Sequence, residues 1–335
     1  MKIWLPYVHA GSGSDVYTER LANGLRASGH ETVLTPVDRR WQYLPWRYLS
    51  VSAPSDADIT LANLGAGFAF RRPGTKLVLV EHHCVFDPAF APYRSRKQAI
   101  VHETLLRHIE RKGLKVCDAL VTVSDYTAKS LRATLGGPAA TVILNGVETD
   151  YFTPPETPAP RNEGGPFDLL FVGNLSRRKG ADLLPAIMDR LGPGFELRYT
   201  RGLRTDDPFA DEPGMRPLGR LSQDELRDAY RDADALLFPS RLEGFGYAAA
   251  EAMACGTPAV AAASSALPEL IDDGVDGRLC SVDDVDAFAA AIKELAAAPG
   301  RRTEMGRRAR EKAVDRFSLD TMSRQYIRLF EELIG

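Results

Sequence analysis

Strand-like and helix-like segments alternate along most of this chain, and this alternation constrains its fold more than any other feature. In the first half, the strand-like runs are KIWLPYV (2–8), ETVLTPV (31–37), ADITLANL (57–64), KLVLVEHH (76–83), ALVTVSDY (119–126) and TVILNGV (141–147). Strands that alternate with helices are joined by right-handed crossovers and form a mainly parallel sheet. The pattern therefore predicts a doubly wound α/β domain.

The same alternation begins again after a proline-rich segment, TPPETPAPRNEGGP (153–166), which excludes a helix or central strand and indicates a linker. Ser222 and Glu225 have capping-box spacing at a predicted helix start. The later strand-like runs are FDLLFVGNL (167–175), FELRYT (195–200), DALLFPS (234–240) and TPAVAAAS (257–264). We expect two Rossmann-like domains facing a cleft, 1–155 and 156–315, with an amphipathic helix over 316–335 packing back towards the first domain.

Composition and charge exclude several classes of protein. A length of 335 residues suits two domains, and a net charge of -3 gives no sign of nucleic-acid binding. The N-terminal MKIWLPYVHAGSGSD lacks the apolar stretch of a signal peptide or membrane span, so a cytoplasmic protein is expected. The four cysteines are scattered without a C-x-x-C pair, which argues against zinc and disulfides; they are Cys84, Cys117, Cys255 and Cys280.

A glycine-rich loop follows the first predicted strand, in HAGSGSDVYTERLANGL (9–25). Gly11 and Gly13 stand where backbone N–H groups at a helix start can approach a phosphate or a sugar. The dinucleotide-binding fingerprint is incomplete, because its third glycine would have to stand at Val16. The alternative is a plain tight turn with Asp15 capping the helix.

Two glutamates flank a Gly-Phe-Gly turn in RLEGFGYAAAEAMACGTPAVAA (241–262). If a helix begins just after Gly246, Glu251 lies about one and a half turns inside it, and Glu243 lies in the preceding loop. A phosphate would accept hydrogen bonds at the helix start, a ribose would lie near Glu251, and a group beyond the phosphate would reach Glu243. Carboxylates accept hydrogen bonds from vicinal hydroxyls, so the arrangement suits a nucleoside diphosphate sugar.

The segment Pro239–Leu279 resembles the signature region of the retaining glycosyltransferases of family 4, with their E-x7-E motif and two-domain GT-B fold. LLFVGNLSRRKGADLL (169–184) resembles the phosphate-binding segment of that family, and GSGSDVYTERLANGLRASGHE (11–31) resembles its N-terminal loop and helix. The resemblance covers about 167–280 and 316–335 and is only local in the N-terminal half.

The resemblance implies a role for each glutamate. Glu243 would hold hydroxyls of the donor sugar together with the backbone of Gly244, Phe245 and Gly246, and Glu251 would hold the ribose.

The resemblance also implies that Lys179, with Arg178, neutralises the diphosphate and the charge that develops on the leaving group. The family commonly has arginine where this chain has Asn174, which removes one expected cation. The Gly-Gly pair of the family corresponds to Ser12–Gly13, which leaves Gly13 as the candidate for close approach to the donor.

Adjacent histidines end the strand-like run VEHHCVFDP (80–88). The family often places a histidine there near the sugar, so His82 and His83 are catalytic candidates. Neighbouring strand residues point to opposite faces, and we favour His82. The alternative for each is a capped strand end or a satisfied, partly buried imidazole.

Neither a metal ion nor a cofactor is expected. In this family the anomeric configuration is thought to be retained without a clear covalent nucleophile, so Glu243 is interpreted as a binding residue. Asp-x-Asp motifs serve metal-dependent glycosyltransferases of another fold, and this chain has DAD at 56–58 and at 232–234. Both precede apolar strands, so we interpret them as structural.

The predicted function is retaining transfer of a hexose from a UDP- or GDP-sugar to a glycan, lipid-linked or small-molecule acceptor. Two segments are candidates for binding an acceptor or lying peripherally on an anionic membrane: RRWQYLPWRYLS (39–50) and the basic stretch 93–115. The alternative for the first is a surface loop packed on its own aromatic side chains. The alternative for the second is a solvated helix face. Rival functions are a nucleotide-sugar epimerase or hydrolase, and a non-catalytic nucleotide-sugar-binding subunit of a polysaccharide system.

Overall fold

The computed structural model spans residues 1–335 and describes residues 1–9, 13–38, 40–41, 44–156, 164–202 and 208–335. It divides into two compact units: unit 1 is Met1–Gly146 with Ser318–Gly335, and unit 2 is Val147–Phe317. None of the helices in these described ranges is long and apolar enough to cross a membrane.

The division between the units falls at Val147, before the proline-rich segment, and not at residue 155. The chain after Val147 already packs on unit 2: the Tyr151 hydroxyl donates to Asp224 at 2.8 Å, and Arg310 donates to the Phe152 carbonyl at 2.8 Å. These contacts hold the chain to unit 2 before its prolines begin.

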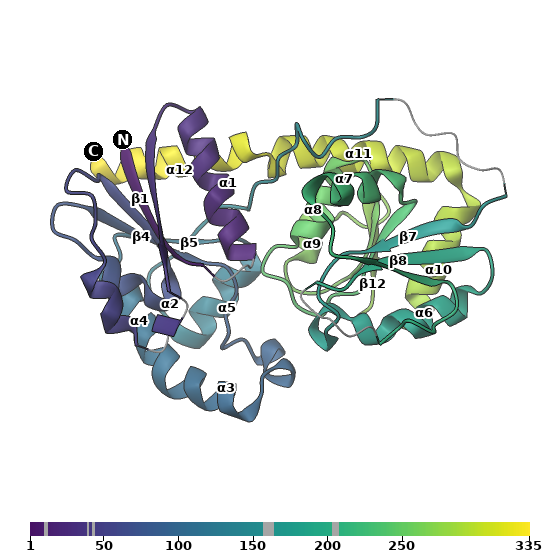
Figure 1. Ribbon diagram of the computed structural model, residues 1–335, viewed down its shortest axis with the longest axis horizontal. Helices are drawn as coiled ribbons and strands as arrows, with labels where there is room; N and C mark the ends of the chain where they lie inside the picture. The colour runs from purple at the N-terminus through teal and green to yellow at the C-terminus, as the bar shows by residue number, and fades with distance from the viewer. Residues whose placement is uncertain (10–12, 39, 42–43, 157–163, 203–207) are drawn as a thin grey trace. The chain divides into compact units, whose positions relative to one another are not determined.

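Unit 1 is built on a sheet that includes β1, β4 and β5 (Figure 1). Within its described residues this parallel sheet has six strands in the order β2-β1-β3-β4-β5-β6. The strands are β1 Lys2–Val8, β2 Glu31–Val37, β3 Ile59–Asn63, β4 Lys76–Glu81, β5 Ala119–Thr122 and β6 Thr141–Val142. The helices and helical turns are α1 Gly13–Ala27, η2 Pro45–Ser50, α2 Leu64–Gly67, η3 Phe68–Phe70, η4 Pro88–Tyr93, α3 Arg96–Val101, η5 His102–Leu106, α4 Arg107–Val116, α5 Asp125–Leu135 and α12 Leu319–Ile334.

Helices cover both faces of this sheet. Trp4 of β1 belongs to a buried cluster with Leu114 of α4 and Leu131 of α5, while the neighbouring strand residue Leu5 points to the other face. There α1 packs against β1, β2 and α12. A Cβ at Gly24 of α1 would collide with the Ser323 side chain of α12, so the terminal helix lies close against unit 1.

Unit 2 repeats the plan, with a described sheet of six parallel strands in the order β12-β11-β10-β7-β8-β9. The strands are β7 Phe167–Phe171, β8 Phe195–Thr200, β9 Met215–Gly219, β10 Ala235–Phe238, β11 Ala259–Ala262 and β12 Gly277–Cys280. The helices and turns are η6 Arg177–Lys179, η7 Ala181–Leu183, α6 Leu184–Leu191, α7 Gln223–Asp232, α8 Tyr247–Ala254, α9 Leu267–Leu270, α10 Val285–Ala297 and α11 Pro299–Phe317.

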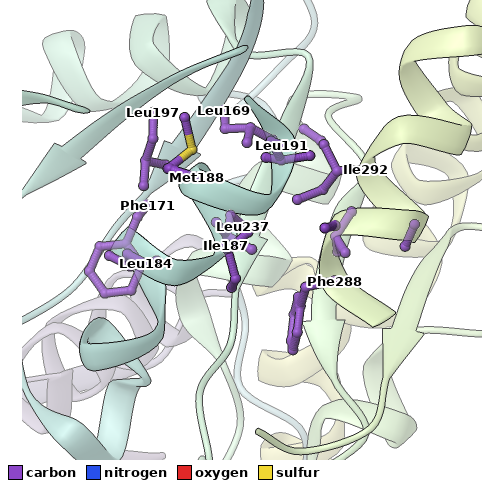
Figure 2. Packing of buried hydrophobic residues seen from close by; sticks show 14 of the residues in the cluster. Leu169, Phe171, Leu184, Ile187, Met188, Leu191, Leu197, Leu237, Phe288 and Ile292 are labelled. Carbon is purple, nitrogen blue, oxygen red and sulfur yellow. The ribbon is translucent and has the colours of Figure 1, made fainter. Parts of the chain in front are cut away.

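The main core of unit 2 lies between its sheet and the helices α6 and α10. Figure 2 shows Ile187 of α6 with Phe288 and Ile292 of α10, beside Leu169 and Leu237 of the strands. The helices α7 and α11 pack against α8, which contacts β10 and β11. Both units therefore have the predicted doubly wound α/β fold. The edge strands β9 and β12 were not expected from the sequence.

Candidate functional site

The lysine turn η6 lies directly against the loop that follows β10. Gly180 ends the turn with φ +72°, and a Cβ at this position would collide with the Pro239 carbonyl. The Arg241 N–H donates to the Arg178 carbonyl at 2.9 Å, and the Arg178 side chain donates to the Leu242 carbonyl at 2.6 Å. The two segments that the sequence separates by some 60 residues therefore form one structure.

Glu243 lies at the centre of this structure and is only 7% exposed. Its Oε1 accepts hydrogen bonds from Lys179 Nζ at 2.5 Å and from the Ser240 hydroxyl at 2.6 Å. Its Oε2 lies 4.0 Å from the Arg178 guanidinium. Three predicted site residues, Glu243, Lys179 and Arg178, are thus brought together.

Charge and backbone contacts fix the state of this carboxylate. Burial alone would raise the pKa of Glu243, but the positive charges of Lys179 and Arg178 outweigh it and lower the pKa. The Glu243 N–H donates to Ser265 Oγ at 2.8 Å. Ser265 has φ +50°, a strained conformation for a serine that this contact helps to hold. Glu243 is therefore ionised and held in place at neutral pH.

The helix α8 begins at Tyr247, directly after Gly246, as predicted. Gly246 has φ +112°, and a Cβ there would lie 3.0 Å from the Leu267 side chain. The Phe245 ring is buried against Phe317 at 5.8 Å, so this side chain serves the core. Phe245 can therefore contact a ligand only through its backbone.

Glu251 lies in the second turn of α8, among buried alanines, and is 7% exposed. The buried Tyr230 hydroxyl of α7 donates to Glu251 Oε2 at 3.0 Å. A carboxylate at this depth needs hydrogen-bond donors, and Tyr230 supplies one from a neighbouring helix. The contact orients Glu251.

A hollow of about 500 Å³ lies beside the end of β7. Among its lining residues are Asn174, Ser176 and Phe209, but neither of the two glutamates. The Gly173 N–H donates to Thr200 Oγ1 at 2.9 Å, which ties the ends of β7 and β8 together. Asn174, which stands where the family commonly has arginine, packs closely against Gly202.

In unit 1, His82 lies just beyond the end of β4 and is half-buried. Its Nε2 lies 3.1 Å from Asn63 Oδ1, and its ring packs edge-on to Tyr17 at 4.4 Å. Since an amide oxygen is an acceptor, His82 Nε2 donates this bond and Nδ1 is the acceptor nitrogen. Burial lowers the pKa of His82 to about 4, so the ring is neutral at physiological pH.

His83 is placed differently. Its backbone N–H donates to Glu81 Oε1 at 2.9 Å, and its ring lies 5.0 Å from Phe90. Burial raises the pKa of Glu81 to about 7. Burial, together with the charge of Glu81, raises the pKa of Glu110 well above its ordinary value. Glu81 at the end of β4 and Glu110 of α4 are therefore a pair of buried carboxyl groups that the sequence did not indicate.

Gly13 is the first residue of α1, and Gly11 and Ser12 lie outside the described residues. Asp15 lies in the first turn of the helix, inside it and not before it, and its carboxylate is 3.3 Å from His9 Nδ1. Asp15 therefore does not stand in the cap position that the tight-turn alternative assigned to it.

The aromatic and basic segment 39–50 is divided between core and surface; Arg39, Gln42 and Tyr43 lie outside the described residues. Tyr48 is buried and stacks on Phe70 at 5.5 Å, while Trp46 and Leu49 are each 57% exposed.

In the basic stretch 93–115, several cations have local partners. Arg94 and Arg107 pair with Glu103 at 3.2 and 2.7 Å, and Lys112 lies 4.3 Å from the centre of the Phe68 ring. Part of the positive charge of this stretch is therefore neutralised within unit 1.

Both DAD motifs hold the starts of strands, as interpreted from the sequence. Asp58 accepts a hydrogen bond from the Lys2 N–H at 2.7 Å, and Asp234 accepts one from the Asp168 N–H at 2.8 Å. In the part of the chain that the structure describes, no three His, Cys, Asp or Glu side chains gather to hold a metal ion. The four cysteines are free thiols.

Two family models together match most of the chain, each over a different part of it. Residues 34–151 match Glycosyltransferase Family 4, and residues 166–298 match Glycosyl transferases group 1. The second match includes the lysine turn and both glutamates. The chain belongs to glycosyltransferase family 4.

Curated proteins agree with the family 4 assignment. The D-inositol 3-phosphate glycosyltransferase of Kribbella flavida is 34% identical over 235 residues, which are 61% of this chain and 54% of that protein. The glycogen synthase of Mycobacterium tuberculosis is 31% identical over 227 residues, 64% of this chain and 54% of that protein. The chain thus spans about half the length of the curated relatives it matches.

Solved structures share the fold of this family 4 chain. Sucrose-phosphate synthase from Thermosynechococcus elongatus superposes with a TM-score of 0.83 at 20% identity, covering 99% of both chains. Anabaena HepE in complex with UDP-glucose gives a TM-score of 0.78 at 18% identity, covering 99% of this chain and 100% of that one. The architecture is therefore GT-B, as expected.

Three residues of this candidate site were not found from the sequence. Ser240 and Ser265 hold the Glu243 side chain and backbone, and Tyr230 orients Glu251. Ser240 stands three residues before Glu243, a spacing that could have been noticed. The contact of Tyr230 arises from the packing of α7 on α8, which no local spacing indicates.

Proposed function

We propose that the protein is a retaining glycosyltransferase that moves a hexose from a UDP- or GDP-sugar to a hydroxyl of a glycan, lipid-linked or small-molecule acceptor. One observation carries the proposal: Lys179 and Arg178 converge on Glu243 at the start of α8, and Glu251 follows in its second turn. Cations suited to a diphosphate thus stand beside carboxylates suited to sugar and ribose hydroxyls.

The arrangement also suits the chemistry of transfer. When the bond between the anomeric carbon and the β-phosphate oxygen breaks, negative charge develops on that oxygen. The acceptor oxygen would bond to the anomeric carbon, and the proton of the acceptor hydroxyl would pass to the departing phosphate oxygen. Lys179 and Arg178 would stabilise that charge, so the proposed reaction requires no metal ion. Glu243 would bind sugar hydroxyls without forming a covalent intermediate.

For unit 1, the proposal keeps Gly13, His82 and His83 as candidate contacts of the donor or acceptor. A neutral His82, with Nε2 bonded to Asn63, suits a hydrogen-bonding role and not a cationic one. Replacement of His82 by Asn should then raise KM more than it lowers kcat, and a change confined to kcat would contradict this role.

The comparisons favour transfer over the rival functions. The relatives named above are glycosyltransferases or sugar synthases, and HepE was solved with UDP-glucose bound. Neither a nucleotide-sugar epimerase or hydrolase nor a non-catalytic binding subunit has comparable support.

A binding panel tests the proposal. UDP, GDP, dTDP and ADP should be screened for thermal stabilisation of the purified protein, followed by calorimetry with the matching nucleotide sugars. Glu251→Ala should weaken nucleotide and nucleotide sugar alike, because both contain the ribose, whereas Glu243→Ala should weaken only the sugar-bearing ligand. Absence of binding by all four nucleotides, or equal losses for both variants with both ligands, would contradict the proposal.

A further inference from the structure

Two residues assigned to different parts of the donor form an ion pair with each other in the structure. Lys179, the candidate contact of the diphosphate, donates to Glu243, the candidate contact of the sugar, at 2.5 Å. Their side chains are 17% and 9% exposed, so water screens the pair only partly. A diphosphate that approaches Lys179 therefore meets a cation that is already paired.

Neighbouring contacts restrain the carboxylate from moving away. Ser240, itself fully buried, donates to Glu243 Oε1 at 2.6 Å, and Ser265 accepts from the Glu243 N–H at 2.8 Å. Because Lys179 and Arg178 lower the pKa of Glu243, the carboxylate keeps its negative charge at neutral pH. A phosphate oxygen bound to Lys179 would lie close to this fixed charge.

We propose that Glu243 is an internal counter-ion of Lys179 that weakens the binding of free nucleoside diphosphate and so favours its release after transfer. In a nucleotide sugar, hydroxyl groups donate to the carboxylate and offset the repulsion. In the product, these donors are gone, and the terminal phosphate carries additional negative charge near neutral pH. The same carboxylate thus helps to hold the donor and to expel the product.

The inference rests on the proposed function, and calorimetry with Glu243→Gln tests it. The amide keeps the shape of the side chain and removes its charge. The variant should bind UDP or GDP, whichever binds the wild type more tightly, about threefold to fivefold more strongly. It should bind the corresponding glucose conjugate more weakly than the wild type does. Glu304→Gln on α11 is the control for net charge, since Glu304 pairs only with Arg307 and Arg308 in the described residues.

The outcomes separate the two claims. Nucleotide binding by the wild type, with equal or weaker binding by Glu243→Gln, would overturn the counter-ion role and leave the proposed function standing. Absence of nucleotide binding by both proteins would overturn the proposed function and this inference with it. If Glu243→Gln does not fold, Glu243→Ala removes the same charge and should change nucleotide affinity in the same direction; a loss of affinity would again overturn the inference.

Discussion

Glu243 in unit 2 and Glu81 in unit 1 are both buried glutamates near the carboxyl end of a strand in a parallel sheet, yet they differ in charge. Glu243 contacts Lys179, and its pKa is lowered. Glu81 has no cation among the causes that set its pKa, and its own charge raises the pKa of the buried Glu110. The pKa of Glu81 is raised to about 7.

The difference shows that burial does not by itself decide whether a carboxyl group is charged. Burial opposes ionisation at both positions. In unit 2 the lysine turn brings two cations to the carboxylate and reverses the effect. In unit 1 no cation is among the causes that set the pKa of Glu81, so burial prevails. A site that binds ligand hydroxyls through an ionised carboxylate needs cations beside that carboxylate, as in unit 2.

Replacing Lys179 by Met should make Glu243 resemble Glu81 and have the largest effect. The carboxylate would lose its closest cation, so its pKa should rise, and a diphosphate would lose its principal charge partner. We expect kcat/KM to fall at least about 100-fold. The free energy of unfolding should fall by about 2 kcal/mol, a modest value because the pair is partly solvated. Steady-state kinetics and urea unfolding measure the two effects.

Arg177→Met is the matched control for this change, because it removes a cation from the same turn whose side chain is 76% exposed. It should alter both quantities little. The double variant Lys179→Met with Glu243→Gln should recover stability without activity, since no buried charge is left unpaired. Retention of kcat/KM within about threefold in Lys179→Met would refute the assigned role of the lysine.

Replacing Glu110 by Gln tests the other side of the comparison. The pKa of Glu81 is about 7 in the folded protein against an ordinary value of 4.5. Between these values the folded protein binds more protons than the unfolded chain, so the unfolding free energy falls as pH rises and stays low above about pH 7. The pKa of Glu110 is also raised, by burial and by the charge of Glu81, so its ionisation opposes folding in the same way. Glu110→Gln removes this contribution and should make the protein about 1 to 2 kcal/mol more stable at pH 8, with little change at pH 4.

Denaturant unfolding at several pH values measures this gain. Glu103→Gln is the control, because Glu103 is exposed, pairs with Arg107 and has a lowered pKa. The effect of Glu103 on the pH dependence of stability has the opposite sign. Its stabilising contribution is present above its ordinary pKa and is lost as pH falls, so Glu103→Gln should be slightly less stable than the wild type at pH 8. A Glu110→Gln protein that is less stable than the wild type at pH 8 would show that the pair does not repel.

The features that the sequence predicted are those with local signals. The alternation of strands and helices, the capping box at Ser222 and Glu225, and the start of α8 after Gly246 all lie within a few residues of their cause. The edge strands β9 and β12 were missed because neither has a continuous apolar run: β9 is MRPLG, with an arginine and a proline, and β12 is GRLC.

The contacts that tune the site could not be predicted, because they join elements that are distant in the sequence. Glu81 and Glu110 are 29 residues apart, and no pattern marks two acids that will be buried together. Lys179 and Glu243 could be assigned separately from the family resemblance, yet their ion pair depends on Gly180 packing against Pro239. The candidate residues could therefore be identified from the sequence, whereas the ionisation state of each carboxyl group could be inferred only from the folded structure.

The smallest expected effect is that of Tyr230→Phe, which removes the hydroxyl that donates to Glu251 Oε2. Since the ring is fully buried and keeps its packing, stability should fall by only about 1 kcal/mol. The carboxylate loses one orienting donor, so nucleotide and nucleotide sugar should both bind about threefold to tenfold more weakly. Tyr151→Phe is the control: it removes a hydroxyl bonded to Asp224 of the same helix α7, but it does not touch Glu251. Calorimetry should show a loss of affinity in Tyr230→Phe and none in Tyr151→Phe. Equal ligand affinities of the two variants would mean that Glu251 needs no orientation from Tyr230. A loss confined to the nucleotide sugar would mean that Glu251 contacts the sugar and not the ribose.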